Sequence, residues 1–134
     1  MNLLPLRLPP GVDLRRALGA ALSDQATDSA FVVSGIGSLN DAVLRFANGT
    51  AETRIAGPLE LVTIAGSLSA TGAHLHVTVS DQHGALTAGH LCYGNIVRTT
   101  AEVLMALLPN WSLAREHDPQ TGFQELVVRP KPSA

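Results

Sequence analysis

The stretch GAHLHVTVSDQHGALTAGHLCYG, residues 72–94, alternates polar and apolar residues on both sides of a short polar segment. Such alternation is typical of β-strands, in which successive side chains point to opposite faces of a sheet. The segment DQHG between the two halves contains the residue types that tight turns favour. The sequence therefore predicts a β-hairpin here, with two antiparallel strands joined by a turn.

Similar strand patterns occur on both sides of this hairpin. Short segments rich in β-branched residues are separated by turn-forming residues, and both features indicate strands. The connections are too short for the repeated helical crossovers of a parallel sheet, so a mainly antiparallel sheet is predicted. The predicted strands are AFVVSGIGSL (30–39), DAVLRFA (41–47), ETRIAG (52–57), LELVTIAGSLS (59–69), AHLHVTVS (73–80), ALTAGHLCYG (85–94) and ELVVR (125–129).

Two segments have helical character. Apolar residues recur at helical spacing from Leu14 to Leu22, and Asp13 is placed to cap the first turn. The segment RTTAEVLMALLP, 98–109, mixes helix-forming and β-branched residues, so a strand that runs into a short helical turn before Pro109 is expected. Helix and sheet together predict an α+β fold.

Length and composition indicate one folded domain. The chain has 134 residues, of which 46% are hydrophobic and 15% charged, as in globular proteins. A single cysteine, Cys92, cannot form an internal disulfide, and prolines interrupt the start before a signal-peptide apolar run develops. The sequence shows no apolar run of membrane-spanning length either. We expect a cytoplasmic protein with one domain over 1–134, its core at about 6–128 and a frayed tail at 129–134.

Histidine carries the main chemical signal, because nucleotide-binding, thiolate-zinc and serine-hydrolase motifs are absent from the sequence. His74 and His76 fall on one face of their predicted strand, with Cα atoms about 6.6 Å apart. Imidazoles placed in this way can converge on one metal ion. For two histidines alone, a solvated or hydrogen-bonded pair is the alternative.

The length of the turn decides whether a third histidine, His90, joins the pair. If residues 82–84 form a three-residue loop with glycine in the left-handed conformation, His76 lies opposite His90 on the same face. If the loop spans 81–84, His90 points to the other face and the three-histidine site is lost. The alternation alone leaves both registers open. His83, at the tip of the turn, is expected to be solvated.

Other polar residues offer weaker signals. Glu102 is either an exposed charge or a general base beside a metal-bound water. Cys92 is expected to be a small buried residue, Arg98 a structural one, and His117 part of a polar turn.

Four segments together closely resemble the PPC domain, the plants-and-prokaryotes-conserved module. The most specific part is the ordered string H-L-H, S-D-x-x-G, G-H-L, G and T-T-A-E, and the resemblance covers about Leu6 to Val128. The segments are FVVSGIGSLNDAVLRFA (31–47), LELVTIAGSLS (59–69), HLHVTVSDQHG (74–84) and GHLCYGNIVRTTAEV (89–103).

The resemblance implies a strongly bent antiparallel sheet beside one or two helices, related in fold to acetolactate decarboxylase, and assembly as a homotrimer. It also implies a metal, commonly zinc, bound by His74, His76 and His90. The preferred interpretation is a stand-alone trimeric zinc-binding module with a regulatory or small-molecule role, more simply a non-enzyme than an enzyme.

Two other functions are compatible with the resemblance. One is a DNA-binding regulator, which the net charge of −2 and the absence of the Arg-Gly-Arg-Pro segments of plant relatives disfavour. The other is a zinc-dependent lyase or hydrolase-like enzyme, in which Glu102 would move protons beside the metal.

Overall fold

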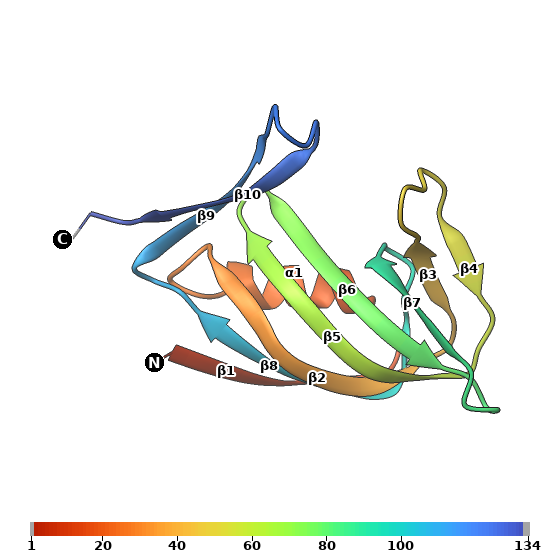
Figure 1. Ribbon diagram of the computed structural model, residues 1–134. Helices are drawn as coiled ribbons and strands as arrows, with labels where there is room; N and C mark the ends of the chain where they lie inside the picture. Colours follow the sequence, from red (N-terminus) through yellow and green to blue (C-terminus); the bar gives the residue numbers. More distant parts are fainter. Residues whose placement is uncertain (1, 133–134) are drawn as a thin grey trace.

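Strands make up most of the chain in the computed structural model, which describes residues 2–132 (Figure 1). The predicted α+β fold with an antiparallel sheet is confirmed, with one helix among the described residues. The elements are β1 (Asn2–Leu8), α1 (Leu14–Ser23), β2 (Ala30–Leu39), β3 (Ala42–Arg45), β4 (Thr53–Ile55), β5 (Leu59–Ser69), β6 (Gly72–Ser80), β7 (Leu86–Leu91), β8 (Val97–Leu107), β9 (Trp111–His117) and β10 (Gln124–Pro130).

Eight strands form one bent sheet in the order β1-β8-β2-β5-β6-β7-β3-β4 (Figure 1). Every neighbouring pair in it is antiparallel. The register shifts within the pairing of β2 with β8, and again between Leu61 and Thr63 of β5. Such bulges bend a strand and increase its twist, which accounts for the curvature of the long central strands.

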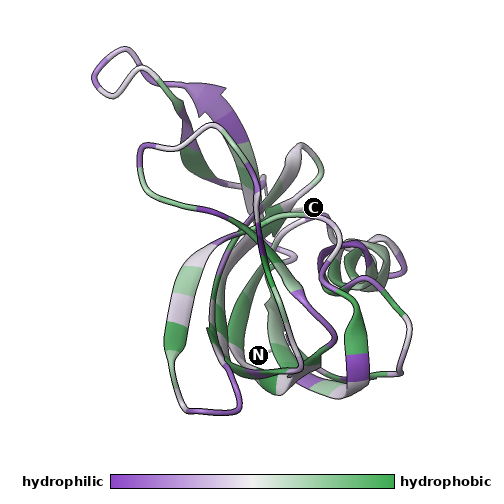
Figure 2. Cartoon of the chain, turned by 90° about the vertical axis from the view of Figure 1, so that its right-hand side faces the viewer, coloured by the Kyte–Doolittle hydropathy of each residue, from purple (hydrophilic) through white to green (hydrophobic). Residues whose placement is uncertain are grey.

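The helix α1 covers one face of this sheet. Leu14, Leu18 and Leu22 lie on its buried side, and Asp13 caps its first turn by accepting a hydrogen bond from the Arg16 N–H at 3.0 Å. Figure 2 shows apolar residues interleaved with polar ones along the strands, as a sheet with one buried face requires. We call the face turned away from α1 the outer face. At ten residues, α1 is about half the length that a membrane-spanning helix needs, and no other helix lies within residues 2–132.

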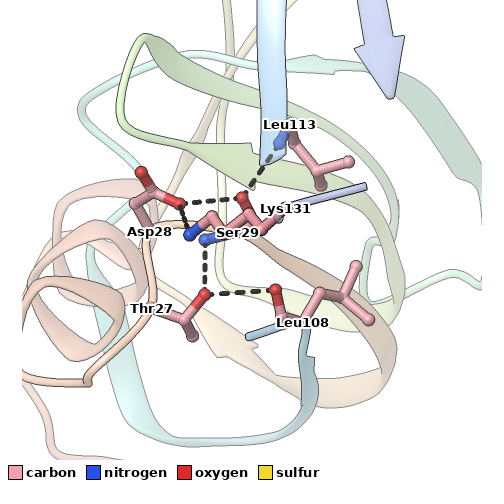
Figure 3. A network of polar contacts seen from close by, with 6 residues as sticks. All are labelled: Thr27, Asp28, Ser29, Leu108, Leu113 and Lys131. Carbon is pink, nitrogen blue, oxygen red and sulfur yellow. Dashed lines mark hydrogen bonds and ion pairs between the residues drawn. The ribbon is translucent and has the colours of Figure 1, made fainter. Parts of the chain in front are cut away.

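The strands β9 and β10 form a separate two-stranded hairpin that projects beyond the main sheet (Figure 1). Its base is held by the buried Ser29, whose Oγ accepts a hydrogen bond from the Leu113 N–H at 3.0 Å (Figure 3). The same hydroxyl donates to Asp28 at 3.0 Å, and Asp28 pairs with Lys131 at 3.1 Å. The residues that precede β2 thus hold both ends of the hairpin.

The helical turn predicted near the end of 98–109 is wrong. β8 is a continuous strand through Leu107, because it pairs with β1 on one side and β2 on the other. Hydrogen bonding along both edges outweighs the helix propensity of Ala, Glu, Leu and Met.

Two strands and the end of the chain also differ from expectation. The sequence patterns did not indicate β1 or β9, and β1 tolerates Pro5 because it lies at the edge of the sheet. Arg129 and Pro130 belong to β10 and Lys131 forms an ion pair, so these residues are not a frayed tail. Positions 133–134 of that predicted tail lie outside the described residues.

Candidate metal centre

Three histidines meet on the outer face where β6 and β7 pair. His76 lies directly opposite His90, and His74 is two residues away on the same face of β6. The ring centroids are 4.5 Å apart for His76 and His90, 4.9 Å for His74 and His76, and 5.2 Å for His74 and His90. One ring nitrogen of each residue lies within 4.8 Å of the other two. The structure thus brings all three predicted ligands together.

The turn between the strands has the three-residue register that this arrangement needs. The Asp81 N–H donates to the Ala85 carbonyl at 3.0 Å, and Gly84 has a φ of +79°, in the left-handed region. The Asp81 carboxylate also accepts hydrogen bonds from the backbone N–H groups of His83 at 2.8 Å and Ala85 at 3.0 Å. These bonds hold the pKa of Asp81 below its ordinary value, and His83 itself is exposed.

Burial on the opposite face fixes the direction of the histidines. Leu75 and Val77, which alternate with His74 and His76, are only 1% and 2% exposed and belong to the core beneath α1. Turning β6 over would expose these two residues and bury two imidazoles, which the hydrophobic effect disfavours. The sequence alternation predicted this orientation correctly.

The donor set fits a metal ion. The Nε2 atoms of His74 and His76 are 3.1 Å apart, close to the edge of about 3.3 Å that a tetrahedron with zinc–nitrogen bonds of 2.0–2.1 Å would have. The buried Nδ1 of His90 has no hydrogen-bond partner among residues 2–132. Among the described residues, these three make up the cluster of His, Cys, Asp and Glu able to hold an ion.

The electrostatic surroundings of His74 and His90 favour neutral imidazole. Burial, and then the nearby Arg115, lowers the pKa of His74 below its ordinary value. Burial, and then Arg45, lowers the pKa of His90 in the same way. Neutral imidazole is the form that coordinates metals, so the surroundings of His74 and His90 favour the form that binds.

A pocket of about 300 Å³ opens beside His74 and His76. The main sheet contributes Phe31 from β2 and a short run of small residues from β5, and the β9–β10 hairpin contributes Arg115 and Glu125. The sequence patterns did not single out these two charged residues, because the strand that carries Arg115 was not predicted.

A protein-family comparison identifies the fold. The model of the Plants and Prokaryotes Conserved (PCC) domain matches residues 1–109, which include the three histidines. The chain belongs to this family. PCC and PPC are two abbreviations of the same family name. The predicted relation of this fold to acetolactate decarboxylase stays a prediction.

Known relatives extend the likeness beyond the matched range. A hypothetical protein from Salmonella cholerae-suis is 34% identical, with a TM-score of 0.94 over 98% of this PCC chain and 95% of that chain. A metal-containing protein from Archaeoglobus fulgidus is 25% identical, with a TM-score of 0.82 over 95% and 94% of the two chains. The Bifunctional protein GlmU of Synechococcus sp. (strain JA-2-3B'a(2-13)) is 40% identical over 130 residues. The 130 aligned residues cover 97% of the PCC chain but only 21% of GlmU, so the chain spans about a fifth of the length of this relative.

Glu102, the other predicted site residue, lies elsewhere in the PCC fold. It is exposed on β8, which β2 and β5 separate from β6, so three strand spacings of roughly 4.8 Å each lie between them. Glu102 lines a different pocket, together with Arg98 and Glu60. Within one chain, the structure therefore does not bring Glu102 to the histidines.

The remaining candidates have structural surroundings. Cys92 is half-buried, and burial raises the pKa of its thiol, so the thiol stays protonated near neutral pH. His117 is the last residue of β9 rather than part of a turn, and it is exposed.

A pocket of about 820 Å³ lies beside α1 in the PCC domain, and Arg15, Arg16 and Tyr93 contribute to its lining. The Arg15 guanidinium already donates to the carbonyls of Leu91 at 2.7 Å and Ala73 at 3.1 Å, and it stacks over Tyr93. Its charge therefore anchors α1 to the sheet. The histidine cluster, although its pocket is smaller, offers the clearer chemistry.

Proposed function

We propose that this PCC-domain chain binds a metal ion, zinc in the first instance, through His74, His76 and His90. The observation that carries the proposal is the three-residue turn, which sets His90 opposite His76 and brings a third ring nitrogen within 4.8 Å of the other two. The metal-containing relative from Archaeoglobus fulgidus, which shares the fold at 25% identity, supports it.

Three protein ligands leave one position of a tetrahedral zinc ion free. An open position of this kind is typical of zinc sites that bind a water or a small molecule, where the metal acts as a Lewis acid. His74 and His76 border the 300 Å³ pocket, so the free position would face a space of small-molecule size. A small-molecule or regulatory role follows from this geometry more directly than DNA binding does.

We also propose that the chain assembles as a homotrimer through the outer face. Val33, Ile36 and Val62 are 55%, 53% and 44% exposed on β2 and β5, beside strands that bury their other face on the core. Large exposed apolar side chains that gather on one face are typical of protein interfaces. The histidines lie on this same outer face, so the metal would bind near a subunit boundary.

Catalysis through Glu102 has less support, because its carboxylate and the histidines of one chain lie on strands separated by β2 and β5. DNA binding also has less support, because the chain has a formal net charge of −2 and not the positive charge that neutralises phosphates.

The metal proposal is tested by zinc binding to the untagged protein and to two matched variants. His76→Ala removes a ligand, whereas His83→Ala removes the exposed histidine at the turn of the same hairpin. We expect one zinc per chain in the wild type and in His83→Ala, by elemental analysis after dialysis. For His76→Ala we expect a loss of affinity beyond the ~100-fold that even an outer-shell change can cause.

Thermal unfolding supplies an independent measure. Zinc at 100 times its dissociation constant should stabilise the wild type and His83→Ala by about 2.7 kcal/mol. His76→Ala should gain much less under the same conditions. Equal zinc content or equal zinc stabilisation in all three proteins would refute the proposed site.

A further inference from the structure

The pocket beside the histidines has an apolar wall, and with the proposed metal bound it would carry a surplus of positive charge. A divalent metal held by three imidazoles keeps its full charge, Arg115 lines the pocket, and Arg45 pairs with His90 across β3 and β7. The opposing charge in the pocket lining is the single carboxylate of Glu125. A metal-loaded site of this composition attracts a small anion.

Arg115 is held in place without being neutralised. Its Nη2 donates to the Gln124 carbonyl at 2.7 Å, and its backbone N–H donates to Thr71 Oγ1 at 3.0 Å. Within residues 2–132 the ion pairs of the structure use Arg54, Arg129 and Lys131, and none uses Arg115. Its guanidinium therefore has further N–H groups to offer, in the fork geometry that suits a carboxylate.

The rest of the lining suits a short hydrocarbon chain. Phe31 and Leu126 contribute apolar side chains, Ala65 and Gly66 leave room, and the volume of about 300 Å³ lies at the small end of ligand pockets.

We infer that the site binds a small carboxylate, with one carboxylate oxygen on the metal, Arg115 on the other oxygen, and the hydrocarbon part against Phe31 and Leu126. This inference rests on the proposed metal site and adds the chemical class of its ligand. Arg115 serves here as a binding residue contributed by the β9–β10 hairpin, and Glu125 limits affinity by repelling the carboxylate.

Cobalt(II) is the probe of choice, because it takes up zinc sites and its visible absorption reports changes in coordination. We expect butyrate to change the spectrum of the cobalt-loaded protein at millimolar concentration, and 1-butanol, of similar shape but neutral, to leave it unchanged. Inorganic phosphate, titrated in parallel, distinguishes a carboxylate site from a general oxyanion site.

Four variants separate the roles of the side chains. Arg115→Gln should weaken butyrate at least ~10-fold, since it loses a charge-assisted hydrogen bond to the carboxylate, and Arg115→Lys should lie between it and the wild type. Glu125→Gln should bind butyrate more tightly than the wild type, which a merely structural role would not produce. Arg129→Gln is the control, because it removes the same charge from the same hairpin. In the wild type Arg129 pairs with Glu116, so this variant should bind butyrate like the wild type.

The outcomes distinguish this inference from the metal proposal beneath it. Absence of cobalt bands that depend on His76 would overturn both. Normal cobalt bands that butyrate does not affect, an equal response to butanol, or wild-type butyrate affinity in Arg115→Gln would overturn the carboxylate inference alone. A response to phosphate without one to butyrate would also overturn it.

Discussion

Gly66 shows how a single residue without a side chain determines the geometry of the histidine cluster. Its φ is +137°, and a Cβ at this position would lie 2.0 Å from the backbone oxygen of His74. Gly66 pairs with Leu75, so the close approach occurs on the strand that carries two of the three histidines. An alanine here would both strain its own backbone and push His74 away from its present place.

Gly66→Ala should therefore lower the free energy of unfolding by about 1–3 kcal/mol and weaken zinc binding as well. Gly19→Ala is the matched control, because a Cβ there meets no atom within 4 Å and the residue lies in α1. The control should raise stability by roughly 0.5–1 kcal/mol and leave zinc binding unchanged. Urea unfolding and zinc titration of both variants measure these effects, and unchanged zinc affinity in Gly66→Ala would contradict the role given to Gly66.

The contribution of Asp81 to the stability of the turn depends on pH. Its pKa is lowered by hydrogen bonds from the backbone N–H groups of Ala85 and His83, so the folded state favours the carboxylate. The resulting stability is fully present above the ordinary pKa of aspartate and disappears as the pH falls through the lowered value.

Asp81→Asn keeps an oxygen acceptor but loses the charge. We expect the wild type to be more stable than this variant near neutral pH, with the difference shrinking as the solution is acidified below about pH 4. Urea midpoints measured at several pH values test this. A difference that is constant with pH would show that the charge of Asp81 does not stabilise the turn.

At this scale the sequence predicted much of the site, for a simple reason. The two-residue alternation of strands places His74 and His76 on one face whatever the rest of the fold does. His90 could not be placed in the same way, because two turn lengths with opposite consequences were both compatible with the pattern. Arg115 and Glu125 reach the histidines only through tertiary packing, which no local spacing encodes.

The elements differ in how far their sequences reveal them. α1 has a cap and helical spacing of leucines, and β5 and β6 have clear patterns, so these were predictable. β8 was predicted as partly helical because its pairing on both edges with β1 and β2 does not appear in its own sequence. Its strand conformation is a consequence of the sheet.

A small buried side chain, that of Ser29, helps to attach the β9–β10 hairpin to the rest of the protein. Ser29 is fully buried, and its hydroxyl accepts from the Leu113 N–H while donating to Asp28. Without the hydroxyl, the Leu113 N–H would remain buried and without its partner, which typically costs about 1–3 kcal/mol.

Ser29→Ala should accordingly lower the free energy of unfolding by about 1–3 kcal/mol. Ser23→Ala, which removes an exposed hydroxyl at the end of α1, should stay within ~0.5 kcal/mol of the wild type. Denaturant unfolding of the three proteins measures the difference. Equal stability of Ser29→Ala and Ser23→Ala would mean that the contacts seen in Figure 3 do not anchor the hairpin.

At the scale of the whole molecule, the outer face carries the exposed apolar side chains Val33, Ile36 and Val62. If it mediates the proposed trimer, the mass in solution should be about 42 kDa, three times the chain mass of 14.0 kDa. A charge placed at the centre of such an interface is strongly unfavourable.

Ile36→Asp should therefore convert the trimer to a monomer, as measured by light scattering after size-exclusion chromatography. Phe123→Asp, at a residue that is 69% exposed in the turn of the β9–β10 hairpin, adds the same charge away from β2 and β5 and should remain trimeric. A wild-type mass near that of one chain, or a trimeric Ile36→Asp protein, would rule out this assembly.

The attachment of the β9–β10 hairpin has a kinetic consequence. The strands β9 and β10 pair with each other and not with the eight-stranded sheet. Side-chain bonds that attach them to the rest of the protein include those of Ser29, Thr71 and Asp28. The hairpin can therefore open without breaking the pairing of the eight-stranded sheet. Such an opening would carry Arg115 and Glu125 away while the histidines stay together. If the proposed metal and carboxylate bind, opening of the hairpin would release the ligand contact of Arg115 without separating the three histidines. The lifetime of the bound ligand could then change without a change in the lifetime of the bound metal.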